Sequence, residues 1–123
     1  MCLLAIQYRS VPEAPILVAA NREEAYDRPS LVPAIQPGKP RVLSGVCNRP
    51  KAIATLGPRS RGLLCKELLR VNSARQAVDL AMEELLSGKY EGVNFVIADA
   101  ESGWVVHGSE DPEVEELEEG LNI

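Results

Sequence analysis

The distribution of proline constrains the fold of this 123-residue chain more than any other feature. Eight of its nine prolines precede residue 59. Proline lacks the backbone N–H and clashes with the preceding helical turn, which excludes long helices from the first half. We therefore expect short strands and turns before residue 59 and helices after it.

Apolar runs bounded by turn residues predict two β-hairpins. Cys2–Tyr8 and Ile16–Ala20 flank a turn and predict a hairpin at the N-terminus. Val93–Asp99 and Trp104–His107 flank Glu101-Ser102-Gly103 and predict another. Residues 28–40 are predicted to form an irregular, proline-rich connection. Two short strands are predicted after it, at 42–46 and 51–56.

A helix is predicted after Ser73, which forms a capping-box pattern with Gln76. Apolar residues then recur on one helical face, and Gly88 is the stop signal. This stripe comprises Ala74, Ala77, Val78, Ala81, Met82, Leu85 and Leu86. A shorter helix is predicted over Arg61–Val71 with Ser60 as its N-cap.

The element order, with strands at both ends and helices between, predicts an α+β fold and one domain over residues 1–123. No apolar run reaches the ~18 residues of a membrane span, and no signal peptide is evident. The net charge of −5 argues against nucleic-acid binding. Seven acidic residues lie between Glu110 and Glu119, which predicts a solvated loop or helix face.

The three cysteines, Cys2, Cys47 and Cys65, predict neither a disulfide framework nor a zinc site. Their number is odd, no secretory signal accompanies them, and their spacing fits no metal motif. We therefore expect a cytoplasmic protein without a metal or cofactor.

Cys2 is the first candidate for chemistry. A small residue at this position allows the initiator methionine to be removed, which would place a free α-amine and a thiol on one residue. The amine, with a pKa near ~7.7–8.0, can take the thiol proton, and the thiolate can attack a carbonyl. The alternative is that Cys2 is a core residue of an apolar strand. If Met1 is retained, the self-activated mechanism fails.

Polar residues that follow the second predicted strand form the second candidate, Asn21-Arg22-Glu23-Glu24. From this position they can point back over the start of the first strand. Arg22 could bind a carboxylate or hold a thiolate, and Asn21 could donate hydrogen bonds. The alternative is a surface turn with a salt bridge.

Several segments together resemble the family named for its Asn-Arg-Asp-Glu (NRDE) motif, also called the transport and Golgi organisation protein 2 family. The similar segments occur in the family's order over residues 1–99. They are Met1-Cys2-Leu3-Leu4, Leu17 to Glu24, Arg28-Pro29, Cys47-Asn48-Arg49, Arg59-Ser60-Arg61-Gly62 and Tyr90 to Phe95.

The resemblance implies an N-terminal-nucleophile-hydrolase-like α-β-β-α sandwich, related to choloylglycine and penicillin V acylases. It implies hydrolysis of a C–N amide bond with Cys2 as nucleophile and Asn21, Arg22 and Glu24 beside it. Asn48 and Asn94 are expected to contact a small amide or acyl ligand. The alternative is a non-catalytic binding or trafficking protein for an acyl or haem-type ligand.

The chain also departs from the family pattern. Glu23 replaces the motif's aspartate, and about two strands are missing in an internal deletion near residues 45–47. Family members are about twice as long, so this chain corresponds to the N-terminal portion of their domain. The strand whose final asparagine supplies an oxyanion donor in the acylases has no counterpart, and Asn122 is not an obvious substitute. Catalysis is therefore expected to be impaired, and a second copy that completes the sheets is a further alternative.

Overall fold

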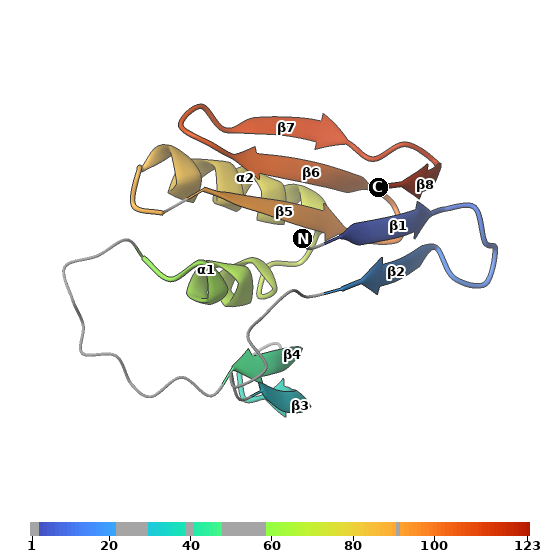
Figure 1. The fold of residues 1–123 in the computed structure, drawn as a ribbon, viewed down its shortest axis with the longest axis horizontal. Coiled ribbons are helices and arrows are strands. Elements are labelled where there is room, and N and C mark those ends of the chain that lie inside the picture. Colours follow the sequence, from blue (N-terminus) through green and yellow to red (C-terminus); the bar gives the residue numbers. More distant parts are fainter. Residues whose placement is uncertain (1–2, 22–29, 39–40, 48–58, 91) are drawn as a thin grey trace.

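The structure is a computed structural model that describes residues 3–21, 30–38, 41–47, 59–90 and 92–123. These residues form a mixed α+β fold with three small sheets and two helices (Figure 1). The elements are β1 (Leu4–Tyr8), β2 (Ile16–Ala20), β3 (Ser30–Gln36), β4 (Val42–Cys47), α1 (Arg61–Leu68), α2 (Ala74–Leu86), β5 (Val93–Ala98), β6 (Gly103–Gly108), β7 (Glu113–Glu116) and β8 (Gly120–Asn122).

Helix α2 begins and ends where the sequence predicts. Gln76 N donates to Ser73 Oγ at 3.2 Å. Gln76 Oε1 accepts from Asn72 N at 3.1 Å, so the reciprocal bond of the capping box is displaced by one residue. Gly88 has a φ of +68°, which glycine adopts without steric cost and which ends the helix.

The apolar stripe of α2 packs against β5 and β6. Its fully buried members are Ala74, Ala77, Val78, Ala81 and Leu85. The prediction for Leu86 is wrong, since this side chain is 68% exposed. Leu86 is the last residue of the helix, and the preceding Leu85 is the one that reaches the end of β6 at Gly108.

Helix α1 is shorter than the predicted 61–71, because it ends at Leu68 and leaves a turn before α2. Ser60 is its N-cap, but the Ser60 side chain makes no capping hydrogen bond. The Ser60 carbonyl oxygen accepts from Leu63 N and Leu64 N instead. Leu64 and Leu68 are buried in the same core as α2, which fixes the helix pair.

Strands β5, β6 and β7 form an antiparallel sheet in that order. The predicted hairpin of β5 and β6 is confirmed, with a register from Val93↔Gly108 to Ala98↔Gly103. Val93, Phe95 and Ile97 pack on the helices, so one face of this sheet is covered by α2. The other face is free to pack on a second sheet.

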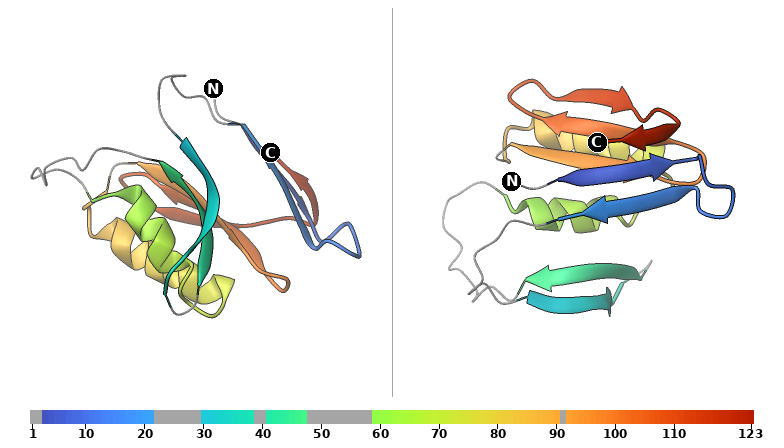
Figure 2. Two further views of the ribbon diagram at one scale, coloured as in Figure 1. Left: turned by 90° about the horizontal axis from the view of Figure 1, so that it is seen from below. Right: turned by 45° about the vertical axis from the view of Figure 1, so that its right-hand side comes forward.

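Strands β2, β1 and β8 form that second antiparallel sheet, with β1 in the centre. Ile6, Tyr8 and Leu117 are buried against Val96, Ala98 and Val105 of the first sheet. The order of layers is therefore helices, β5-β6-β7 and β2-β1-β8 (Figure 2). The residues described here contain one helical layer, whereas the resemblance implies two.

Three segments differ from the sequence prediction. The irregular connection expected over 28–40 contains β3, which pairs with β4 across a register shift between Leu31 and Ala34. The acidic segment contains β7, because its backbone pairs with the free edge of β6 while all four side chains stay exposed. Strand β8, which was not predicted, pairs with β1.

Other strand predictions have different outcomes. Strand β4 confirms the short strand predicted at 42–46. The strand predicted at 51–56 lies outside the described residues. Neither helix of the described residues is long and apolar enough to cross a membrane.

Candidate functional site

The structure describes two of the six predicted site residues, Asn21 and Asn94. Cys2, Arg22, Glu24 and Asn48 lie outside the described residues. The site is therefore built from the residues that flank them. These are Leu3, which follows Cys2 in the chain, and Asn21, which precedes Arg22.

Asn21 lies directly across from Leu3 and is joined to it by two hydrogen bonds. Leu3 N donates to the Asn21 side-chain oxygen Oδ1 at 2.5 Å. Asn21 N donates to the Leu3 carbonyl oxygen at 3.0 Å. The Leu3 N–H belongs to the peptide group that joins residues 2 and 3. Asn21 thus fixes the backbone immediately after Cys2, as expected for a polar residue that points back over the start of the first strand.

Local structure explains why Asn21 reaches this position. The antiparallel register pairs Leu4 with Ala20 and continues to Tyr8 with Ile16. The end of β2 therefore lies beside the start of β1, and an asparagine one residue beyond the strand can bond the opposite backbone. The Pro12–Pro15 turn at the far end of the hairpin sets this register, and Arg9 N donates there to Pro15 O at 2.7 Å.

The inner face of the N-terminal sheet becomes more exposed toward this end. Side chains at alternate positions of β1 share one face, so Leu4, Ile6 and Tyr8 all point toward the other sheet. Tyr8 and Ile6 are 4% and 3% exposed, but Leu4 is 37% exposed. Leu3, beside Asn21, is 52% exposed. Apolar side chains are thus accessible around the segment that Asn21 holds.

Asn94 is the second residue of β5, lies opposite His107 of β6 and is exposed. It alternates with Phe95 and therefore lies on the same face as Val96 and Ala98, which contact the N-terminal sheet. Strands β5 and β1 run in the same general direction in Figure 2, on two sheets that pack face to face. Asn94 is near the start of β5, and Asn21 lies beside the start of β1, on different sheets.

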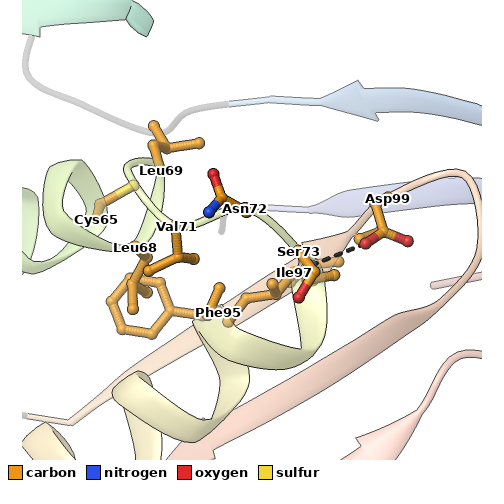
Figure 3. A pocket seen from close by; sticks show the side chains of 13 residues that line it. Cys65, Leu68, Leu69, Val71, Asn72, Ser73, Phe95, Ile97 and Asp99 are labelled. Carbon is orange, nitrogen blue, oxygen red and sulfur yellow. Dashed lines mark hydrogen bonds between the residues drawn. The ribbon is translucent and has the colours of Figure 1, made fainter. Parts of the chain in front are cut away.

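A groove of about 290 Å³ lies elsewhere, between α1, the α1–α2 turn and β5 (Figure 3). Its walls are largely apolar and include Leu68, Leu69 and Phe95. Cys65 is exposed on its α1 side. Partial desolvation raises the pKa of the Cys65 thiol, so this cysteine is a weaker nucleophile at neutral pH than a free one.

Asp99 lies at one end of this groove and has a structural role that the sequence analysis missed. Its Oδ2 accepts from Ala74 N, the first residue of α2, at 2.8 Å. Its Oδ1 accepts from Glu101 N at 2.9 Å and from Ser102 N at 2.8 Å. These donors, Ala74 first, lower the pKa of Asp99. An aspartate at the end of a predicted strand and before a Ser-Gly turn was the available sequence signal.

Two arginines near the start of α1 have partners within the chain. Arg59 Nη1 bonds Glu84 Oε2 at 2.8 Å, and its guanidinium lies 5.6 Å from the Tyr90 ring centroid. Arg61 Nη1 donates to Gly92 O at 3.0 Å. These contacts join the start of α1 to α2 and to the segment between α2 and β5, and they indicate a structural role.

Two other polar residues are explained by local contacts. Asn122 accepts from Glu118 N and donates to Glu118 O, which closes the turn into β8. His107 Nε2 lies 3.5 Å from Glu115 of the neighbouring strand. No group of three or more His, Cys, Asp or Glu side chains in the described ranges could hold a metal ion.

Comparison with known proteins gives one match. No curated protein sequence and no solved structure matches this chain. A family model does match its N-terminal part, which includes Cys2, Asn21 to Glu24 and Asn48. This match supports, for residues 1–55, the resemblance to the Transport and Golgi organisation 2 family.

Proposed function

We propose that this protein is a cysteine N-terminal-nucleophile hydrolase that acts on a C–N amide bond and uses Cys2 as its nucleophile. The observation that carries the proposal is the pair of hydrogen bonds between Asn21 and Leu3. They fix the peptide that follows Cys2 at one end of a body made of two packed sheets. The family match over residues 1–55 adds the motif context.

The proposed nucleophile and its base both belong to the first residue of the processed chain. After removal of Met1, the α-amine of Cys2 takes the thiol proton, and the thiolate forms a C–S bond to the amide carbonyl carbon. The C–N bond then breaks, and the α-ammonium returns its proton to the leaving amine. Water hydrolyses the resulting thioester. Asn21 is a positioning residue in this scheme, with Arg22 and Glu24 as the neighbouring polar groups.

The surroundings of this segment favour a substrate with an apolar acyl part. Leu3 and Leu4 are 52% and 37% exposed, although Leu4 begins the apolar strand β1 and Leu3 directly precedes it. Contact with an acyl chain would remove this surface from water, which is favourable by about 25 cal/mol per Å². Asn94, near the start of β5 on the opposite sheet, is the described polar candidate for contact with the amide.

Hydrolysis of simple N-acyl amides, followed by amine release, tests the proposal. Cys2→Ala is expected to abolish turnover, because it removes the nucleophile. Asn21→Ala is expected to lower kcat by ~10–100-fold, since a loosened positioning contact misplaces the nucleophile. Cys65→Ala is the matched control and is expected to keep full activity. Equal activity of the wild type and Cys2→Ala would refute the proposal.

A non-catalytic binding protein for an acyl or haem-type ligand is the second candidate. The same exposed apolar side chains favour it, because they would bind an apolar ligand without any nucleophile. The two functions differ in their dependence on Cys2. Binding of a fluorescent fatty acyl probe that persists in Cys2→Ala, without amine release by the wild type, would favour this candidate over the hydrolase.

A further inference from the structure

Strand β5 is an edge strand of the β5-β6-β7 sheet, which is the middle sheet of the layered body. Among the described residues, no strand pairs with the outer side of β5. Asp99 and Ser102 lie directly beyond the Ala98↔Gly103 pair that ends the β5–β6 register. Asp99 N donates to Ser102 O at 2.9 Å, so these two residues form a hydrogen-bonded pair. In an antiparallel ladder, hydrogen-bonded pairs alternate with non-hydrogen-bonded pairs. The backbone N–H and C=O groups of Asn94, Val96 and Ala98 therefore point away from β6. No backbone partner on the free side of β5 is present in the described part of the chain.

The layers on both sides extend beyond this edge. Helix α1 and strand β2 both lie on the side of β5 that faces away from β6 (Figures 1 and 2). The groove between α1 and β5 leaves Leu69 48% exposed. Val18, on the inner face of β2, is 60% exposed although its neighbour Ile6 is buried. The middle sheet is therefore narrower than the layers that sandwich it.

The middle sheet lacks a strand beside β5, whereas the β3–β4 hairpin has strands but no layer that covers them. It does not pack extensively against any other helix or strand of the described residues, and it stands apart in Figure 1. Val32 and Ile35 are 82% and 65% exposed. An isolated two-stranded hairpin is marginally stable in water, so these side chains need a partner surface.

The two strands of this hairpin are not equivalent as pairing partners. Pro33 removes a backbone N–H from β3, which suits an outer edge strand. Strand β4, with the sequence VLSGVC, has no proline and no charge, and neither does β5. The β7 edge differs, because Glu113, Glu115 and Glu116 would repel a second copy of themselves.

We infer that the β3–β4 hairpin of one copy of this chain docks beside β5 of a second copy, with β4 added to the β5 edge. The exchange is reciprocal, so that each copy donates one hairpin and accepts one. It supplies partners for the outward backbone groups of β5 and covers Val32, Ile35, Leu69 and Val18 together. The inference is independent of the chemistry at Cys2.

Light scattering on a sizing column, over a range of concentrations, measures the predicted dimer. The wild type is expected at twice the chain mass of 13.4 kDa. The double variant Val32→Lys/Ile35→Lys should raise the dimer Kd by ~10-fold or more, because docking would bury two unpaired charges. Leu86→Lys is the matched control, since Leu86 is 68% exposed at the end of α2, and it should leave the Kd unchanged.

A second variant tests the acceptor edge without depending on the hairpin. Asn94→Pro removes an outward N–H from β5 and should also yield monomers, with an unchanged circular dichroism spectrum. A dimer unaffected by both the hairpin variant and Asn94→Pro would overturn the inference. A wild type that stays monomeric at all concentrations would also overturn it. This outcome includes a monomer whose hairpin docks on β5 of its own chain.

Discussion

Asp99 joins three elements of the fold through one carboxylate, and its removal gives the sharpest stability prediction. The carboxylate accepts from Ala74 N at the start of α2 and from Glu101 N and Ser102 N in the β5–β6 turn. Ala74 is 5% exposed, so its N–H has no ready access to water once Asp99 is gone. The change Asp99→Ala therefore leaves an unpaired donor at a buried helix start.

The magnitude follows from the burial of each donor. An unpaired, partly buried N–H such as that of Ala74 costs about 1–3 kcal/mol. The exposed Glu101 N–H can bond water, and its bond contributes about 0.5 kcal/mol, while the partly buried Ser102 N–H contributes about 1 kcal/mol. We expect Asp99→Ala to lower the free energy of unfolding by about 2.5–4.5 kcal/mol, from a total of about 5–15 kcal/mol for an ordinary domain.

Urea denaturation followed by circular dichroism measures this loss as a shift of the midpoint at constant m-value. Asp79→Ala is the matched control, because Asp79 pairs only with the exposed Arg75 at 3.4 Å. Such a pair contributes about 0.3–0.5 kcal/mol. A loss in Asp99→Ala no larger than that in Asp79→Ala would refute the reasoning.

The pH dependence supplies an independent check. The pKa of Asp99 is lowered in the folded state, so its stabilisation is complete above the unfolded value of ~3.9. It is lost as the pH falls through the folded pKa. The stability difference between wild type and Asp99→Ala should therefore be constant between about pH 5 and 7 and should shrink below about pH 4. A difference that grows on acidification would contradict this sign.

Two further substitutions test the packing between the sheets. Tyr8→Phe should leave stability within about 1 kcal/mol of the wild type or raise it, since the buried Tyr8 hydroxyl has no hydrogen-bond partner among the described residues; a larger loss in thermal unfolding would contradict this. Gly103→Ala should destabilise by about 1–3 kcal/mol, because the new Cβ would lie 2.8 Å from Leu117 Cδ1 and 3.3 Å from Tyr8 Cζ. Gly62→Ala, whose Cβ would meet only Ser60 Oγ at 3.7 Å on the exposed start of α1, is the control and should stabilise by about 0.5–1 kcal/mol.

Local sequence signals predicted the elements whose structure is determined locally. The capping pattern at Ser73 and the apolar stripe located α2, and turn residues located the β5–β6 hairpin. Strand β2 has the predicted bounds because its apolar run is bounded by a turn and by the polar residues that begin at Asn21. In each case the side chains that define the element lie within it.

Elements that depend on a distant strand were not predictable in this way. Pro33 argued against a strand, yet β3 accommodates it beside a register shift in a two-stranded hairpin. The acidic segment forms β7 only because β6 offers a free edge. Leu86 fits the helical period but lies past the sheet that covers the rest of the stripe. Tertiary pairing overrides local preference in these segments.

The candidate site was predictable as far as the N-terminal hairpin defines it. The hairpin register brings Asn21 to Leu3, and this follows from two strands of known order joined by a short turn. The position of Asn94 relative to Asn21 depends on how the two sheets stack, which no local pattern specifies. The groove beside β5 depends on the same stacking and was not predicted.

The state and reactivity of the first residue test the central claim most directly. Mass spectrometry of the N-terminal peptide, after a timed reaction with iodoacetamide at neutral pH, measures both. We predict a chain that begins at Cys2 and is alkylated there at least ~10-fold faster than at Cys65, whose pKa is raised. Retention of Met1 on every molecule, or alkylation of Cys2 no faster than of Cys65, would contradict the proposal of a self-activated N-terminal nucleophile.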